Sequence, residues 1–292
     1  MKTGRGSVRL VMVMVLTAAT VLPASALELE FGGFFGNLGL PWAQDTPITT
    51  SQYPSTNWLY GGLASFTNDF GQGFELTIEY ETDTVLRHIV RGVVTYENGM
   101  ASLSAGPMVG VFNSPTSPLK AGIDIGFRLE VPGLAFFSAV VESSMGAGLA
   151  AVGDYAQERS EIVAGWYALN AICSFSMETR RYAKVLADDQ WLVDAATDYL
   201  FSVDVFKKGV PYRVLADLGY RAMTRTYADD TVDGLGAIIL GAEISATVSD
   251  MVSLRVSLDS GVYVFGLEEM VGRGPAPDAF MFSGNLAAIL RL

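Results

Sequence analysis

Residues 120–131 read KAGIDIGFRLEV, and this stretch divides its side chains by parity. The odd-numbered positions are all apolar: Ala121, Ile123, Ile125, Phe127, Leu129 and Val131. The even-numbered positions are charged or glycine: Lys120, Gly122, Asp124, Gly126, Arg128 and Glu130. Because successive side chains of a β-strand point to opposite faces, this spacing predicts a strand with one apolar and one polar face.

The same alternation recurs along the chain. It is clearest in 27–35, 74–81, 210–221, 238–248 and 252–264, with Leu215 as an exception on the polar face. Strands of soluble sheets usually have about five or six residues, whereas a tilted membrane-crossing strand needs about 9–11. Most of these segments reach the longer range. The length therefore favours a transmembrane barrel over a soluble β-sandwich or another soluble periplasmic β-protein.

The expected fold is an all-β, antiparallel up-and-down transmembrane barrel over residues 27–292. Fourteen strands are predicted, at 27–37, 57–68, 71–82, 84–97, 100–112, 120–131, 134–148, 161–178, 181–189, 197–207, 210–225, 235–248, 251–265 and 279–292. This count puts most long connections (38–56, 113–119, 149–160, 226–234 and 266–278) at one end and short turns at the other, as in bacterial barrels. Alternation is weak in 181–189, so twelve strands is the alternative.

Three turns predict strand register. Asn98-Gly99 is a type I′ signal that pairs Tyr96 with Ala101, and Lys208-Gly209 similarly pairs Val205 with Tyr212. A three-residue loop centred on Asp83 pairs Glu79 with Arg87 and Glu75 with Arg91. All three registers keep the apolar residues on one face.

Residues 1–26 have the organisation of a secretory signal peptide. A basic segment with Lys2, Arg5 and Arg9 precedes an apolar run over 10–22, and Ala24-Ser25-Ala26 offers a small-residue cleavage site. The apolar run is shorter than the roughly 20 residues of a membrane-spanning helix, which disfavours an uncleaved anchor. We therefore expect export.

Composition excludes several functions. The formal net charge is −12, which disfavours nucleic acid as a partner because a basic face supplies that affinity. Cys173 is the only cysteine, so neither a disulfide framework nor a thiolate metal site is expected, and no cofactor is predicted. The mean hydropathy is +0.32, yet no stretch after residue 26 reaches 18 apolar residues. The apolar content is therefore assigned to strands.

The final segment carries a family resemblance. Apolar or small residues occupy every second position: Phe280, Phe282, Gly284, Leu286, Ala288, Leu290 and Leu292. This pattern resembles the C-terminal signal strand of bacterial outer-membrane β-barrel proteins, although Leu292 replaces the usual terminal aromatic residue. The resemblance implies location in the bacterial outer membrane, contact with its lipid, and recognition of 280–292 by the barrel-assembly machinery.

The polar parity predicts which charges line the lumen, because charge on the lipid face is costly. The predicted lining is Glu75, Glu79, Arg87, Arg91, Asp124, Arg128, Glu130, Asp204, Arg213, Asp217, Arg221, Glu243, Arg255, Asp259 and Arg291. These residues suit either a selectivity lining for a water-filled pore or ion-pair ladders that rigidify a narrow or plugged barrel.

Enzymatic activity is not expected. His88, the only histidine, has lipid-face parity, so a paired interfacial histidine is favoured over a Ser–His site. Aromatic residues near strand ends, such as Tyr96, Tyr212 and Phe282, fit interfacial girdles. The expected function is a porin-like channel for passive passage of small solutes. The alternative is a non-transporting structural or adhesive surface barrel that acts through its extracellular loops.

Overall fold

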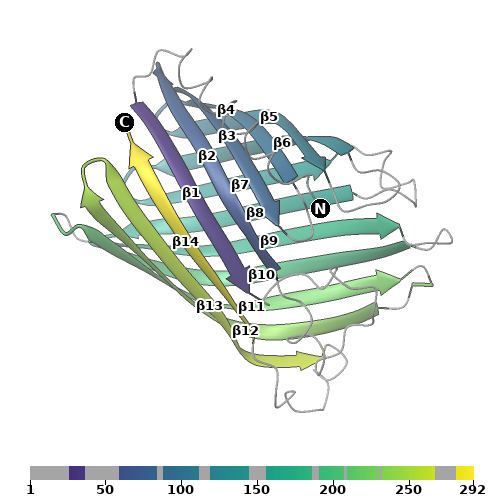
Figure 1. The fold of residues 1–292 in the computed structure, drawn as a ribbon. Helices are drawn as coiled ribbons and strands as arrows, with labels where there is room; N and C mark the ends of the chain where they lie inside the picture. Colours follow the sequence, from purple (N-terminus) through teal and green to yellow (C-terminus); the bar gives the residue numbers. More distant parts are fainter. Residues whose placement is uncertain are drawn as a thin grey trace.

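A closed barrel of fourteen antiparallel strands forms the described part of the chain (Figure 1). The computed structural model describes residues 26–36, 59–83, 88–111, 119–144, 156–185, 191–206, 209–227, 229–230, 232–266 and 281–292. The strands are β1 (Ala26–Gly36), β2 (Leu59–Gly71), β3 (Phe74–Asp83), β4 (His88–Glu97), β5 (Ala101–Val111), β6 (Leu119–Val131), β7 (Ala135–Ser144), β8 (Ala156–Ala168), β9 (Ala171–Val185), β10 (Trp191–Phe206), β11 (Tyr212–Tyr227), β12 (Val232–Ser249), β13 (Val252–Gly266) and β14 (Met281–Arg291). The expected signal peptide lies outside the described residues, apart from Ala26.

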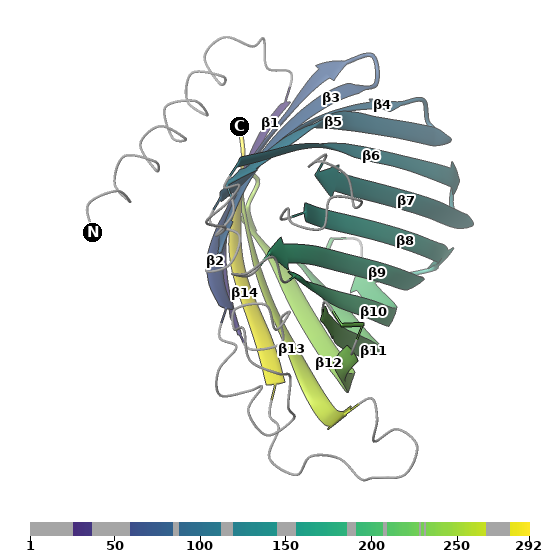
Figure 2. The ribbon, with the colours of Figure 1, turned by 90° about the vertical axis from the view of Figure 1, so that its right-hand side faces the viewer.

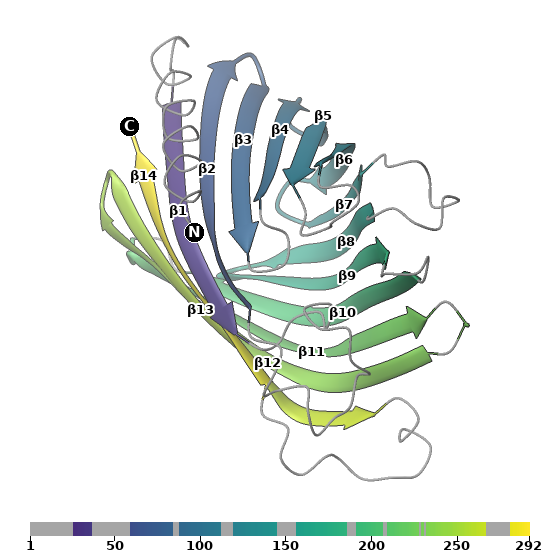
Figure 3. The same ribbon diagram turned by 45° about the vertical axis from the view of Figure 1, so that its right-hand side comes forward.

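Each strand pairs with its sequence neighbours, and β14 closes the barrel against β1. Glu28 lies opposite Arg291, and the backbone N–H of Leu292 donates to the carbonyl of Leu27 over 2.8 Å. Figure 3 shows β1 and β14 side by side, with the remaining strands wrapping around a common axis. The predicted fold class and the count of fourteen strands are confirmed.

The two faces of the wall differ in chemistry. On β6, the outward side chains of Ile125 and Leu129 are 51% and 54% exposed, and similar apolar residues cover the outside of the other strands. The inward positions of the same strand carry Asp124, Arg128 and Glu130. An apolar outside and a polar inside are the reverse of a soluble barrel and match a membrane barrel. No helix among the described residues is long and apolar enough to span a membrane.

Two predicted hairpin registers are wrong by two residues, although the assignment of faces is unaffected. Tyr96 pairs with Leu103 rather than Ala101, and Asn98 and Ala101 close the turn. Gly99 therefore occupies the first central position with φ +83°, which is the type II′ arrangement rather than type I′. Gly209 also has a positive φ of +81°, and Val205 pairs with Val214 rather than Tyr212.

The predicted β3–β4 register is wrong by four residues. Glu79 pairs with Arg91 and Glu75 with Thr95, because β3 continues to Asp83 and β4 begins only at His88. An even shift again leaves every side chain on its predicted face. Arg87 lies outside the described residues.

The predicted boundaries around residues 149–207 are also wrong. The segment expected as one strand at 161–178 is divided by a turn at Leu169 and Asn170, and the expected turn after residue 178 lies inside β9. The outward parity changes at that turn, from even positions such as Trp166 to odd positions such as Phe175. This change of parity is the sequence signal that marks the hairpin.

Strand length varies around the wall. The longest strand, β12, has 18 residues, β10 and β11 have 16 each, and β3 and β4 have 10. Short turns join the strands at one end of the barrel, so the additional length extends at the other end. Figure 1 shows this longer part of the wall in green.

Candidate functional site

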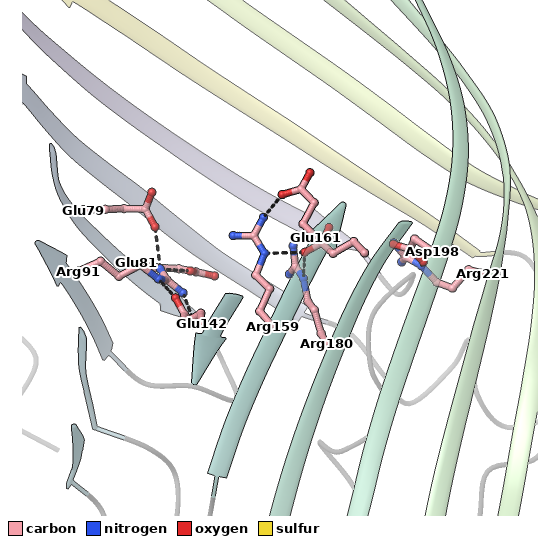
Figure 4. Close-up of polar contacts among 10 residues, drawn as sticks. Glu79, Glu81, Arg91, Glu142, Arg159, Glu161, Arg180, Asp198 and Arg221 are labelled. Carbon is pink, nitrogen blue, oxygen red and sulfur yellow. Dashed lines mark hydrogen bonds and ion pairs between the residues drawn. The ribbon is translucent and has the colours of Figure 1, made fainter. Parts of the chain in front are cut away.

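Charged side chains from many strands form a central belt on the inner face of the barrel. Each has the parity of the inner face on its strand, and Figure 4 draws most of them as sticks. The central belt comprises Glu79, Glu81, Arg91, Asp124, Glu142, Arg159, Glu161, Glu178, Arg180, Asp198, Asp217, Arg221 and Asp259. It therefore contains nine carboxylates and four guanidiniums. Arg225, a fully buried guanidinium at an inner position of β11, lies outside this set toward the end of the strand.

Arg91 is the most enclosed cation of the belt. Its Nη1 atom donates to Glu79 Oε1 over 2.6 Å and to Glu81 Oε2 over 2.8 Å, both on the neighbouring strand β3. Its Nε and Nη2 atoms donate to Glu142, which lies on β7. The Arg91 and Glu142 side chains are 8% and 1% exposed. One guanidinium thus holds three carboxylates from two separate parts of the wall.

Glycines allow this contact across two intervening strands. Gly106 on β5 and Gly122 on β6 lie at inner positions between β4 and β7. A Cβ atom on Gly122 would lie 2.7 Å from the Ser144 Cα, and one on Gly106 would lie 2.8 Å from the Val93 Cα. Neither position has room for a side chain, so only backbone occupies these two inner positions between the strands of Arg91 and Glu142.

The belt continues along β8 and β9 as an alternating network. Arg159 Nε donates to Glu178 Oε1 over 2.8 Å, and Arg159 Nη2 donates to Glu161 Oε2 over 3.1 Å. Arg180 Nε donates to the same Glu178 oxygen over 2.7 Å. Figure 4 shows these side chains next to the Arg91 group. Alternation of sign along neighbouring strands stabilises the wall and orients each charge.

The next part of the belt lies on β10 to β13. Arg221 binds Asp198 in a two-pronged pair, with Nε to Oδ1 at 2.6 Å and Nη2 to Oδ2 at 2.5 Å. Asp217 and Asp259 lean toward each other over Gly241, because a Cβ there would meet Asp259 Oδ1 and would lie 3.1 Å from Asp217 Oδ2. In the described part of the chain, neither aspartate forms an ion pair.

A second set of charges lies close to the end of the barrel with the short turns, and is called the rim. It comprises Glu28, Glu30, Asp69, Glu75, Glu97, Arg128, Glu130, Asp204, Arg213, Glu243, Arg255 and Arg291. Four ion pairs connect its members, and each joins one guanidinium to one carboxylate: Arg291–Glu28, Arg255–Glu30, Arg128–Glu130 and Arg213–Asp204.

Aromatic side chains support one of these pairs. The Tyr167 hydroxyl donates to Glu130 Oε1 over 2.8 Å, and Arg128 Nη2 donates to the Tyr167 hydroxyl oxygen over 3.1 Å. The Arg128 guanidinium also lies 4.1 Å above the Phe136 ring centroid. Such stacking fixes the plane of the guanidinium.

The structure places every predicted lining residue in one of these two sets, apart from Arg87, which lies outside the described residues. The prediction missed Glu28, Glu30, Asp69, Glu81, Glu97, Glu142, Arg159, Glu161, Glu178, Arg180 and Asp198. Several of these lie in the wrongly divided segment, where the apolar parity changes at Leu169. Glu142 was within a predicted strand, but nothing in the sequence pairs it with Arg91 on a distant strand.

Apart from the enclosed Arg91–Glu142 pair, several inner charges remain partly accessible to water. Arg159 and Glu161 in the central belt are 32% and 30% exposed, and Arg128 and Arg213 in the rim are 38% and 50% exposed. Other inner positions carry small side chains, such as Ser102, Ser104 and Gly106 on β5. The belt therefore combines fixed charges with water-accessible volume.

His88 lies on the outer face, as its parity predicts. The Tyr80 hydroxyl and His88 Nδ1 are 2.7 Å apart, and the two rings stack with their centroids separated by 5.9 Å. No group of three or more metal-ligating side chains occurs in the described ranges. The histidine thus has an aromatic neighbour on the outer surface rather than a place in the belt.

Comparisons with known proteins give similarities of fold. No family model matches the chain, and no curated protein matches it. Similar solved structures include an outer membrane channel from Pseudomonas putida F1, with 10% identity, coverage of 93% of this chain and 97% of that one, and a TM-score of 0.48. A bacterial polysaccharide outer membrane secretin has 8% identity, 91% and 98% coverage, and a TM-score of 0.49. The monoaromatic hydrocarbon channel CymD has 10% identity, 96% and 91% coverage, and a TM-score of 0.47.

Proposed function

We propose that this protein is a bacterial outer-membrane channel for the passive passage of small solutes. The observation that carries the proposal is a set of charges, several of them partly water-accessible, on the inner face of a closed barrel with an apolar surface outside. An apolar exterior requires lipid, and hydrated charges inside require an aqueous lumen.

Barrel size supports an open interior. Side chains fill a barrel of about eight strands, whereas about 16–18 strands leave an aqueous channel. Here fourteen strands close the wall (Figure 2), and much of the inner face carries residues too small to reach the axis. Ser283, Asn285 and Ala287 on β14 are examples, together with the serines and glycines of β5.

The ion pairs are compatible with passage. Arg91, Arg159 and Arg221 are bound to carboxylates of neighbouring strands, which holds their guanidiniums close to the wall. Held in this way, they line a pore of fixed shape.

Liposome swelling with uncharged sugars tests the proposal without involving charge. Refolded, heat-modifiable protein is inserted into vesicles, which are then diluted into isotonic arabinose or a larger oligosaccharide. We expect rapid swelling in arabinose and slower swelling in the oligosaccharide. Absence of swelling in a folded sample would show that the lumen is closed.

A second candidate is a surface barrel that does not transport. The greater length of β9 to β13 favours it, because this part of the wall extends furthest at the end opposite the short turns. An extended wall of this kind can present a binding surface. Absence of swelling with a folded sample would favour this second function.

We further propose that the barrel-assembly machinery recognises residues 280–292 through their outward apolar side chains. Leu286 is 60% exposed on the outer face of β14, and Phe282 stacks edge-on against Phe35 of β1; Phe280 lies outside the described residues. Leu286→Ser is expected to slow assembly assisted by the machinery more than unaided refolding in detergent. An equal effect on both would indicate a purely structural role.

A further inference from the structure

We propose that the lumen selects cations over anions, so that small cationic solutes are the preferred substrates. The inference rests on the proposed channel function and specifies its substrate class. It rests on the net charge of the central belt and of the rim, which is negative in both.

The central belt has more carboxylates than its guanidiniums neutralise. Six of its nine carboxylates lie in ion pairs with Arg91, Arg159, Arg180 or Arg221. The other three are Asp124, Asp217 and Asp259, and no ion pair joins them to a cation in the described ranges. Every arginine of the belt is already engaged by at least one carboxylate. The uncompensated charge of the belt is therefore negative.

Asp217 and Asp259 concentrate this charge on one part of the wall. They lie on β11 and β13, on either side of Gly241 of β12, which adds no side chain between them. Arg221, the nearest guanidinium of this wall, is bound to Asp198 through both carboxylate oxygens. A passing cation would meet two carboxylates side by side, whereas an anion would meet no free guanidinium among the described belt residues.

The rim repeats the imbalance with eight carboxylates and four guanidiniums. Each of its arginines is paired with one carboxylate, which leaves a net negative charge at this end too. A solute that crosses the barrel thus passes two successive negative regions. Neither region attracts an anion electrostatically, because the net charge of both is negative.

Salt screens the field of these carboxylates. The Debye length is about 10 Å at 0.1 M ionic strength and about 3 Å at 1 M. Selectivity that arises from fixed charge should therefore be strong at 0.1 M and weak at 1 M. Selectivity that arises from pore size would not change with salt.

Reversal potentials of single channels in a KCl gradient test the inference. We expect potassium to be more permeant than chloride at 0.1 M, with the ratio approaching one at 1 M. Asp217→Asn and Asp259→Asn should each lower the ratio about twofold at 0.1 M, as expected for one screened unit charge in the pore wall. Both substitutions keep the size of the side chain. Heat-modifiable migration on a gel checks that each variant is folded.

Glu158→Gln is the matched control. Glu158 is paired with Arg181 at 3.4 Å on the outer face of β8, so its removal deletes one negative charge outside the lumen. We expect no change of the permeability ratio. Chloride selectivity, an absence of selectivity at 0.1 M, or equal effects of Glu158→Gln and Asp217→Asn would overturn the inference while leaving the channel intact. Absence of any conductance, with no swelling in sugars, would instead reject the channel itself.

Discussion

Replacement of Arg91 by methionine tests the most enclosed ion-pair group of the central belt. The substitution keeps an unbranched side chain of similar length and removes the guanidinium that binds Glu79, Glu81 and Glu142. Glu142, at 1% exposure, then loses its enclosed cation, while Glu79 and Glu81 are 32% and 23% exposed and can be hydrated. The damage is therefore concentrated on Glu142.

The magnitude follows from this difference in burial. Breaking a buried ion pair by removal of one partner costs about 3–5 kcal/mol, because the remaining charge is uncompensated. Arg159 lies opposite Glu142 on β8 and can compensate partly, which favours the lower end of the range. We expect Arg91→Met to lower the free energy of unfolding by about 3 kcal/mol. Glu79→Gln, which removes a partly exposed partner, should cost about 1 kcal/mol or less.

Urea unfolding of the barrel in lipid vesicles, followed by tryptophan fluorescence and by heat-modifiable migration, measures these differences. The double variant Arg91→Met with Glu142→Met removes both buried charges and should recover most of the loss, since an apolar pair of similar volume replaces a buried ion pair at little cost. Two results would refute the reasoning. One is equal destabilisation by Arg91→Met and Glu79→Gln; the other is a double variant that is no more stable than Arg91→Met.

Two further pairs of substitutions probe the wall itself. Leu218 is 54% exposed on the outer face of β11, so Leu218→Arg should cost about 2–4 kcal/mol in the same unfolding assay, whereas Leu215→Arg on the inner face of that strand should be tolerated. Similar costs at both positions would contradict the assignment of faces. Gly122→Ala should destabilise the barrel because a Cβ there would lie 2.7 Å from the Ser144 Cα, and Gly92→Ala should be neutral because nothing lies within 4 Å of its Cβ position. Equal effects at the two glycines would show that the close approach between β6 and β7 is not a constraint.

The alternation of apolar and polar residues was sufficient to predict the barrel. Strand parity depends only on the period of two, so the faces of residues such as Asp124 and Arg213 could be assigned without knowledge of their partners. The strand registers are harder to predict from the sequence, because each hairpin register depends on which residue of the turn adopts positive φ. At Gly99 the glycine takes the first central position, which moves the pairing by two residues and leaves parity intact.

Contacts between strands that are distant in sequence could not be predicted. Arg91 and Glu142 belong to β4 and β7, and two strands with inner glycines at Gly106 and Gly122 lie between them. The alternation of apolar and polar residues does not predict the curvature of a sheet, since a flat and a bent sheet have the same period. The hairpin at Leu169 can be predicted from the sequence, because the apolar parity changes there.

Cysteine accessibility along β13 tests the central claim, an aqueous lumen behind an apolar exterior. In a Cys173→Ser background, single cysteines at Ser257 on the inner face and Leu258 on the outer face are exposed to a membrane-impermeant, hydrophilic thiol reagent in proteoliposomes. The structure predicts rapid reaction of Ser257→Cys and protection of Leu258→Cys, which is 55% exposed without lipid. Protection at both positions would contradict a water-filled lumen, and the reverse order of reactivity would contradict the assignment of faces.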